Sequence, residues 1–67
     1  MSPMLVNGEV WDGPAGVTIA QLVAGRGLPD RGVAVARNGE VVPRSRWEVV
    51  ALQPGDAVDI VTAVAGG

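Results

Sequence analysis

The chain has 67 residues, the size of one small domain, and a formal net charge of −2 at pH 7. It contains no histidine and no cysteine, and its five cationic residues are all arginines, which excludes imidazole, thiolate and Schiff-base chemistry. The acidic balance and the lack of a basic cluster argue against nucleic-acid binding. We therefore expect neither an enzyme that works through its own side chains nor a metal site.

The apolar content of 48% is mostly valine and alanine, and β-branched residues favour strands. No apolar run approaches the ~18 residues that a membrane-spanning helix needs. The start, Met1-Ser2-Pro3, lacks the basic and apolar regions of a signal peptide. We expect a cytoplasmic protein with no membrane association.

Asn-Gly occurs twice, at 7–8 and 38–39, and both times Glu-Val follows. Asn-Gly between apolar runs is the strongest short hairpin signal, because a type I′ turn needs positive φ at both central residues. We predict two β-hairpins. The first joins Met4–Val6 to 9–12, with Val6 opposite Glu9 and Met4 opposite Trp11, and the second joins Val33–Arg37 to Glu40–Val42.

One short helix is predicted between the hairpins. Residues 18–21 read Thr-Ile-Ala-Gln, which fits a capping box with Thr18 as N-cap and Gln21 reaching back to it. Ile19, Leu22 and Val23 form an apolar stripe at helical spacing. Gly27 fits the C′ position, with Leu28 folding back onto Val23.

The second half of the chain contains one more strand. Pro43 suits the end of an edge strand, and a turn or short 3₁₀ segment is expected at 44–47, with Trp47 covering the core. Pro54-Gly55 fits a type II turn. Alternating apolar residues then predict the longest strand at 57–64.

The predicted order β-β-α-β-β-β indicates an α+β protein with a β-grasp (ubiquitin-like) fold. It is a mixed sheet of about five strands with one helix across one face, and the first and last strands form its centre. The helix is expected to cover Met4, Val6, Val33, Val35, Val58 and Ile60. An SH3-like barrel is the alternative, but it leaves the capping box unexplained. Residues 1–64 are predicted to form the domain, and residues 65–67 a flexible Gly-Gly tail.

The opposite face of the sheet is a candidate docking surface. Leu5, Ala36, Val61 and Ala63 are expected there, and small apolar residues on an exposed face are unusual unless a partner covers them. The alternative to a docking surface is that these are scattered apolar residues of an ordinary protein surface. The polar rim of this face is expected to contain Arg44, Arg46, Asp56 and Asp59.

Three stretches of the sequence resemble the ThiS-type sulfur carriers, a ubiquitin-like family of thiamin biosynthesis. These are Val-Asn-Gly-Glu at 6–9, the block 33–47 with Val-Pro-Arg before a tryptophan, and the strand that ends in Ala-Gly-Gly at 65–67. The resemblance covers nearly the whole chain. One departure is Gly13, near which that family has a large aliphatic residue.

The resemblance implies a carrier rather than an enzyme. A ubiquitin-activating-type adenylyltransferase would use ATP and Mg to adenylate the carboxylate of Gly67, and a sulfur donor protein would convert it into a thiocarboxylate. Thiazole synthase would then receive the sulfur. Gly66 and Ala65 would let the tail pass through a narrow channel, since glycine lets backbone approach closely. The chain itself would bind no cofactor.

Two other functions remain open at this stage. One is a MoaD-type sulfur carrier for molybdopterin synthesis, although such proteins are usually longer. The other is a non-catalytic ubiquitin-like modifier or protein-binding module. A modifier would be found attached to lysines of other proteins, and a binding module would tolerate the loss of Gly67.

Overall fold

The computed structural model of the chain describes residues 3–28 and 31–62. Its elements in chain order are β1 (Met4–Val6), β2 (Glu9–Trp11), α1 (Ile19–Gly25), β3 (Val33–Arg37), β4 (Glu40–Val42), the 3₁₀ helix η1 (Arg44–Arg46) and β5 (Ala57–Thr62). The predicted division between residues 64 and 65 lies outside the described residues. Within the described ranges, no helix is long and apolar enough to cross a membrane.

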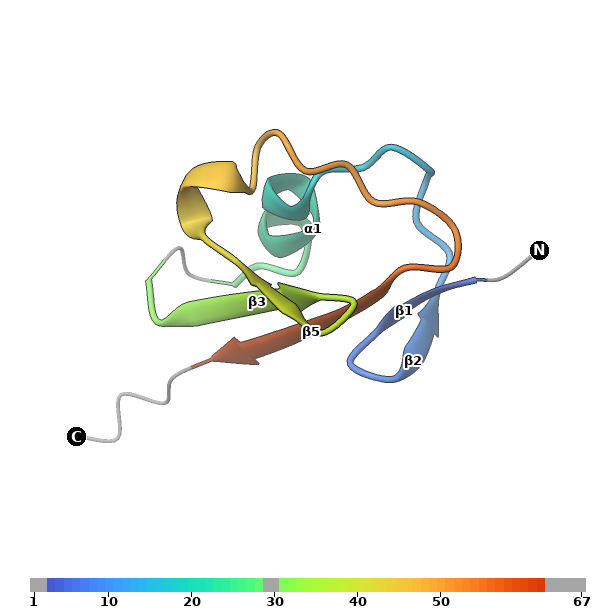
Figure 1. The fold of residues 1–67 in the computed structure, drawn as a ribbon, viewed down its shortest axis with the longest axis horizontal. Coiled ribbons are helices and arrows are strands. Elements are labelled where there is room, and N and C mark those ends of the chain that lie inside the picture. Colours follow the sequence, from blue (N-terminus) through green and yellow to red (C-terminus); the bar gives the residue numbers. More distant parts are fainter. Residues whose placement is uncertain (1–2, 29–30, 63–67) are drawn as a thin grey trace.

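The strands form one five-stranded sheet in the order β2-β1-β5-β3-β4, with α1 across one face (Figure 1). β1 and β5 are parallel, and the other neighbouring pairs are antiparallel. This arrangement confirms the expected mixed sheet with one helix. The register of the first hairpin, Met4 opposite Trp11 and Val6 opposite Glu9, is also as predicted.

β2 ends at Trp11, so the predicted strand end at Asp12 is wrong by one residue. Trp11 lies opposite Met4, the first residue of β1, so the pairing has no partner beyond it. Just after β2, a Cβ atom at Gly13 would overlap the ring atoms of the Trp11 indole. The indole therefore occupies the space beside the chain at Gly13. This contact gives a physical account of why a glycine stands where the resemblance leads us to expect a large aliphatic residue.

The amino-terminal end of α1 has a hydrogen-bond partner for each of its first four N–H groups. Thr18 and Gln21 form the predicted capping box, with Gln21 N donating to Thr18 Oγ1 at 3.1 Å and Thr18 N to Gln21 Oε1 at 3.0 Å. Ile19 and Ala20 donate to the carbonyls of Val50 and Trp47, and Leu22 N donates to Thr18 O. A helix of 7 residues is only marginally stable by itself. The long-range hydrogen bonds to the carbonyls of Val50 and Trp47 therefore hold it in place.

The carboxyl-terminal end of α1 is a Schellman motif. Gly27 has φ of +68° and donates to Ala24 O, while Leu28 N reaches back to Val23 O at 3.4 Å. Leu28 is half-buried against the core. The predicted helix end at Gly27 is therefore confirmed.

The core lies between α1 and one face of the sheet. Its buried members are Met4, Val6, Ile19, Leu22, Val23, Val35, Trp47, Leu52, Val58 and Ile60. Val33 packs against this cluster without being fully buried. Trp47 closes the core beside β4, as expected, and its Nε1 donates to Val42 O at 3.0 Å. The predicted 3₁₀ segment is η1, and β4 is an edge strand, as Pro43 indicates.

The two Asn-Gly turns hold β5 from both of its edges. Asn7 and Asn38 have φ of 52° and 51°, as type I′ turns require. Asn7 N donates to Val58 O, and its Oδ1 accepts from Ile60 N at 2.7 Å. Asn38 N donates to Ala57 O, and its Oδ1 accepts from Ala57 N at 2.9 Å. Asn7 thus extends the β1–β5 ladder beyond the end of β1, and Asn38 extends the β3–β5 ladder beyond the end of β3.

Asp56 joins the second turn to the segment before β5. Its carboxylate accepts hydrogen bonds from Arg37 Nε at 3.0 Å, Asn38 Nδ2 at 3.1 Å and Gln53 N at 2.9 Å. Asp56 is buried, so its predicted place in an exposed polar rim is wrong. This internal role of Asp56 was not predicted from the sequence, because the donors to its carboxylate lie up to 19 positions away in the chain.

The environment of Asp56 lowers the pKa of its carboxyl group. Burial acts in the opposite direction and is the largest single influence, but the hydrogen bonds from Gln53, Asn38 and Arg37, together with the charge of Arg37, outweigh it. A carboxyl group with a lowered pKa in the folded state stabilises the fold above its unfolded pKa of about 4. That contribution is lost as the pH falls through the folded value.

Removing the helix cap should be measurable. We expect Thr18→Ala to lower the free energy of unfolding by about 1 kcal/mol, because Gln21 N loses its acceptor, Thr18 Oγ1. Thr18→Ser, which keeps the hydroxyl, should lie close to the parent. Urea denaturation gives the midpoints, and an unchanged midpoint for Thr18→Ala would contradict a stabilising cap.

Replacing Asp56 should change both stability and its pH dependence. At pH 7, Asp56→Asn should cost about 2 kcal/mol, because the amide cannot accept the three hydrogen bonds as the carboxylate does. As the pH falls below about 4 and through the lowered folded pKa of Asp56, the parent should lose this advantage and the two proteins should converge. Urea midpoints measured across this pH range test the expectation.

Asp59→Asn is the matched control, because Asp59 is an exposed carboxylate on β5, three residues after Asp56. It should change stability at pH 7 by less than about 0.5 kcal/mol. Equal effects of the two substitutions at pH 7, or a stability gap for Asp56→Asn that does not narrow as the pH falls below about 4, would show that the buried carboxylate is not the stabilising group.

Candidate functional site

The path of β5 determines where the tail leaves the domain. β5 lies in the middle of the sheet and is the last described element, ending at Thr62 at one end of the molecule (Figure 1). Residues 63–67, which contain the predicted sulfur-attachment site Gly67 and the predicted passage residues Gly66 and Ala65, lie outside the described residues. Their roles stay predictions.

The sheet face opposite α1 is built by simple alternation along the strands. Because side chains alternate between faces, the neighbours of buried Val6, Val35 and Ile60 point away from the helix. The registers place on this face Leu5, Val10, Ala34, Ala36, Val41, Ala57, Asp59 and Val61. We call these eight residues the open face.

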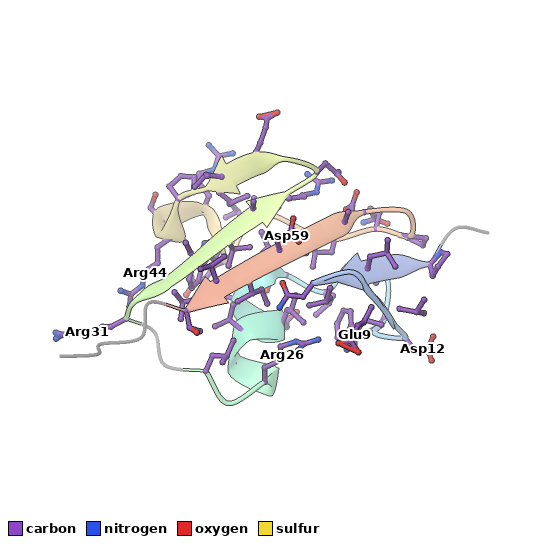
Figure 2. All side chains as sticks on the ribbon, turned by 90° about the horizontal axis from the view of Figure 1, so that it is seen from below. Glu9, Asp12, Arg26, Arg31, Arg44 and Asp59 are labelled. Atoms are coloured by element: carbon purple, nitrogen blue, oxygen red, sulfur yellow. The ribbon has the colours of Figure 1, made fainter. Side chains whose placement is uncertain are left out.

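The open face is mainly apolar, and its three valines are exposed. Val10 and Val61 each expose 63% of their surface, and Val41 exposes 76%. Asp59 is the charged member of the face within the described strands, and Figure 2 shows it on the middle part of β5. A face made mainly of exposed valine and of alanine suits contact with an apolar surface of another protein.

The predicted docking residues fall on this face as far as they are described. Leu5 and Ala36 are half-buried and Val61 is exposed, whereas Ala63 lies outside the described residues. Val10 and Val41 were missed as docking candidates. The signal for them was available, because a two-residue turn pairs Val10 with Leu5 and Val41 with Ala36.

The predicted polar rim does not gather around the open face. Arg44 and Arg46 belong to η1, which Figure 1 shows on the same side of the sheet as α1. Asp56 is used inside the fold, as described above. Of the four predicted rim residues only Asp59 lies on the open face, so this face is less charged than expected.

The chain matches the ThiS family over residues 4–67. It is 39% identical over 64 residues to a protein of Paramagnetospirillum magneticum called thiazole synthase, a match that covers 96% of this chain. A thiazole synthase of Magnetococcus marinus is 39% identical over 62 residues. The chain spans only 20% and 19% of the lengths of these two relatives.

A third relative is similar in length. The sulfur carrier protein ThiS of Escherichia coli K12 is 31% identical over 64 residues, which cover 96% of this chain and 97% of the relative.

Two solved structures are similar to the whole domain. The crystal structure of a thiamine biosynthesis protein (ThiS) from Geobacter metallireducens has a TM-score of 0.76 at 28% identity, covering 96% of this chain and 97% of that one. A solution structure from the same organism has a TM-score of 0.79 at 28% identity, covering 97% of this chain and 87% of that one. These matches confirm the β-grasp fold expected from the sequence.

Proposed function

The chain belongs to the ThiS family, and from this we propose that it is a sulfur carrier of thiamin biosynthesis that carries sulfur on the carboxyl group of Gly67. The observation that carries the proposal is the extent of the family match, which runs to residue 67 and so includes the Gly66-Gly67 pair. The chain acts as the substrate of its partner enzymes and not as an enzyme, in keeping with its lack of histidine, cysteine and lysine.

The chemistry proposed for Gly67 takes place in two steps. A carboxylate is a poor electrophile, so a ubiquitin-activating-type adenylyltransferase first joins it to the α-phosphate of Mg-ATP and releases pyrophosphate. Sulfur at the oxidation level of sulfide, supplied by a donor protein, then attacks the acyl carbon as hydrosulfide; AMP leaves with the bonding electrons, and one proton is released. The product is a thiocarboxylate. ATP and Mg belong to the partner enzyme, and this chain binds neither on its own.

The geometry of the domain supports delivery of a carboxyl group at a distance. Beyond Thr62, at the end of the central strand, five residues remain. Fully extended at ~3.4 Å per residue, they reach about 17 Å. A segment that finishes in two glycines, which have no side chains, can enter an enclosed site that the folded domain cannot enter.

Thiazole synthase is the proposed acceptor of the sulfur. Two relatives that bear that name contain a segment 39% identical to this chain. In those proteins a carrier-like segment therefore lies in the same polypeptide as the rest of the synthase. In this chain we infer that the open face makes the corresponding contact between separate proteins, and that it also contacts the adenylyltransferase.

Shortening the tail by one residue should abolish the reaction. Deleting Gly67 moves the carboxyl group back by about 3.4 Å, and displacements of 1 Å already cost ~10²-fold in rate. After incubation with the adenylyltransferase, Mg-ATP and sulfide, intact mass should show one oxygen-to-sulfur exchange in the parent and none in the deletion variant. Conversion of the deletion variant at the parent's rate, or no conversion of the parent, would show the proposal to be wrong.

Gly66→Ala is the control for length. It keeps Gly67 at its place and adds one methyl group, so it should slow conversion less than the deletion does. Both variants should match the parent in thermal denaturation, since both changes lie beyond β5.

A charge on the open face should weaken activation without unfolding the domain. Val61→Asp would place a carboxylate in the proposed contact, where its desolvation should lower kcat/KM for adenylation by at least about tenfold. Val49→Asp is the matched control, because Val49 is equally apolar, 69% exposed and outside the open face. Equal adenylation of the two variants would exclude this face as the contact. Circular dichroism would verify that both are folded.

A further inference from the structure

The parallel pair at the centre of the sheet is unequal in length. β1 ends at Val6, opposite Val58, whereas β5 continues to Thr62. Beyond Val58, Asn7 supplies the last partner on this side, with its Oδ1 accepting from Ile60 N. On its other side β5 stays paired with β3 as far as Thr62, which lies opposite Val33.

The alternation of the ladder shows which way the last backbone groups of β5 point. Ala57 exchanges bonds with Asn38 on the β3 side, while Val58 O and Ile60 N bond toward β1. Because successive residues of a strand direct their N–H and C=O groups to alternate sides, Ile60 O and Thr62 N point to the same side as Ile60 N. No hydrogen bond to these two groups is formed by the described residues.

A groove lies beside this unpaired edge. It has a volume of about 250 Å³ and is lined by Asn7, Arg26, Leu28, Ile60 and Thr62. Arg26 is the C-cap of α1, so the end of the helix forms one wall and the edge of β5 the other. Figure 2 shows the Arg26 side chain beside the lower end of the helix. The groove occupies the position that a longer β1 would fill.

We propose that this groove takes an extended segment of the activating enzyme, which pairs as an added strand with the Ile60–Thr62 edge of β5. The inference rests on the proposed function, because that function brings the enzyme to this place. Gly67 lies at most about 17 Å beyond Thr62, so an enzyme that encloses its carboxyl group must also surround the chain close to Thr62. Unpaired edge groups offer main-chain hydrogen bonds to such a segment.

The occupant is therefore recognised by its backbone. An added strand would accept from Thr62 N and donate to Ile60 O, and its side chains on the α1 side would contact Leu28 and Arg26. Pairing at this point would also hold the first part of the tail extended, directed into the enzyme.

Thr62→Pro tests the proposal, because it removes one N–H and places the proline ring in the groove. That N–H points away from β3, so the β3–β5 ladder should persist, as proline is tolerated on strand edges. Thr62→Val, which has the same shape and keeps the N–H, is the matched control. We expect Thr62→Pro to weaken binding to the adenylyltransferase about tenfold or more by calorimetry, and Thr62→Val less than about twofold.

Amide hydrogen exchange on the parent gives a second measurement that does not depend on the folding of a variant. The Thr62 amide should exchange slowly in the complex and quickly in the free protein. Equal binding of Thr62→Pro and the parent, or unchanged exchange at Thr62, would overturn the added strand. An absence of binding by the parent would overturn it as well. If binding behaves as expected but the parent never gains sulfur, the proposed function fails and the strand stands.

Discussion

The position of β5 depends on two asparagine side chains, Asn7 and Asn38, and the rest of the structure depends on β5. Asn7 and Asn38 are the first central residues of their type I′ turns and have positive φ. At each of them the main-chain carbonyl therefore no longer continues the hydrogen-bond ladder with β5. The side-chain Oδ1 of each asparagine accepts the β5 N–H that is left, from Ile60 and from Ala57. Glycine at these two positions would allow the same turn, but it has no side-chain oxygen to accept the hydrogen bond. One residue type thus meets a local and a long-range requirement together.

With β5 held in this way, the two faces of the sheet have different tasks. One face packs Val, Ile, Leu and Met side chains against α1 and supplies the core. The open face presents mainly valine and alanine, whose short side chains let another protein approach the sheet closely. The central strand carries residues of both kinds in alternation and then leads toward the tail. The proposed docking surface and the proposed tail chemistry are therefore joined through this one strand.

The helix illustrates how a domain of this size is stabilised without disulfides. α1 has 7 residues, and the segment between η1 and β5 supplies carbonyl partners for its first N–H groups. Asp56 adds a further link, since Leu5 N donates to its carbonyl while its carboxylate bonds Arg37 and Asn38. Within the described ranges, no buried side-chain polar atom lacks a partner. Such cross-links between distant segments offset the small core that a short chain can form.

The local sequence by itself determined the elements whose defining contacts join residues three to five positions apart. The two Asn-Gly hairpins and their registers, the capping box of Thr18 and Gln21, and the helix end at Gly27 are of this kind. Alternation along the predicted strands also assigned Leu5, Ala36 and Val61 to the face opposite the helix. From these parts the β-grasp topology followed, because few arrangements bury one helix on such a sheet.

Only the tertiary structure decided features that depend on partners far apart in the chain. Asp56 is internal because Arg37 and Asn38 approach it from the second hairpin. The Trp11 indole lies against Gly13, where it leaves no room for a Cβ atom. The groove beside β5 exists because β1 is shorter than its neighbour, and the bond that ends their pairing joins Asn7 to Ile60, 53 positions later. No local pattern encodes such a contact, since it forms only when the whole sheet brings both ends of the chain together.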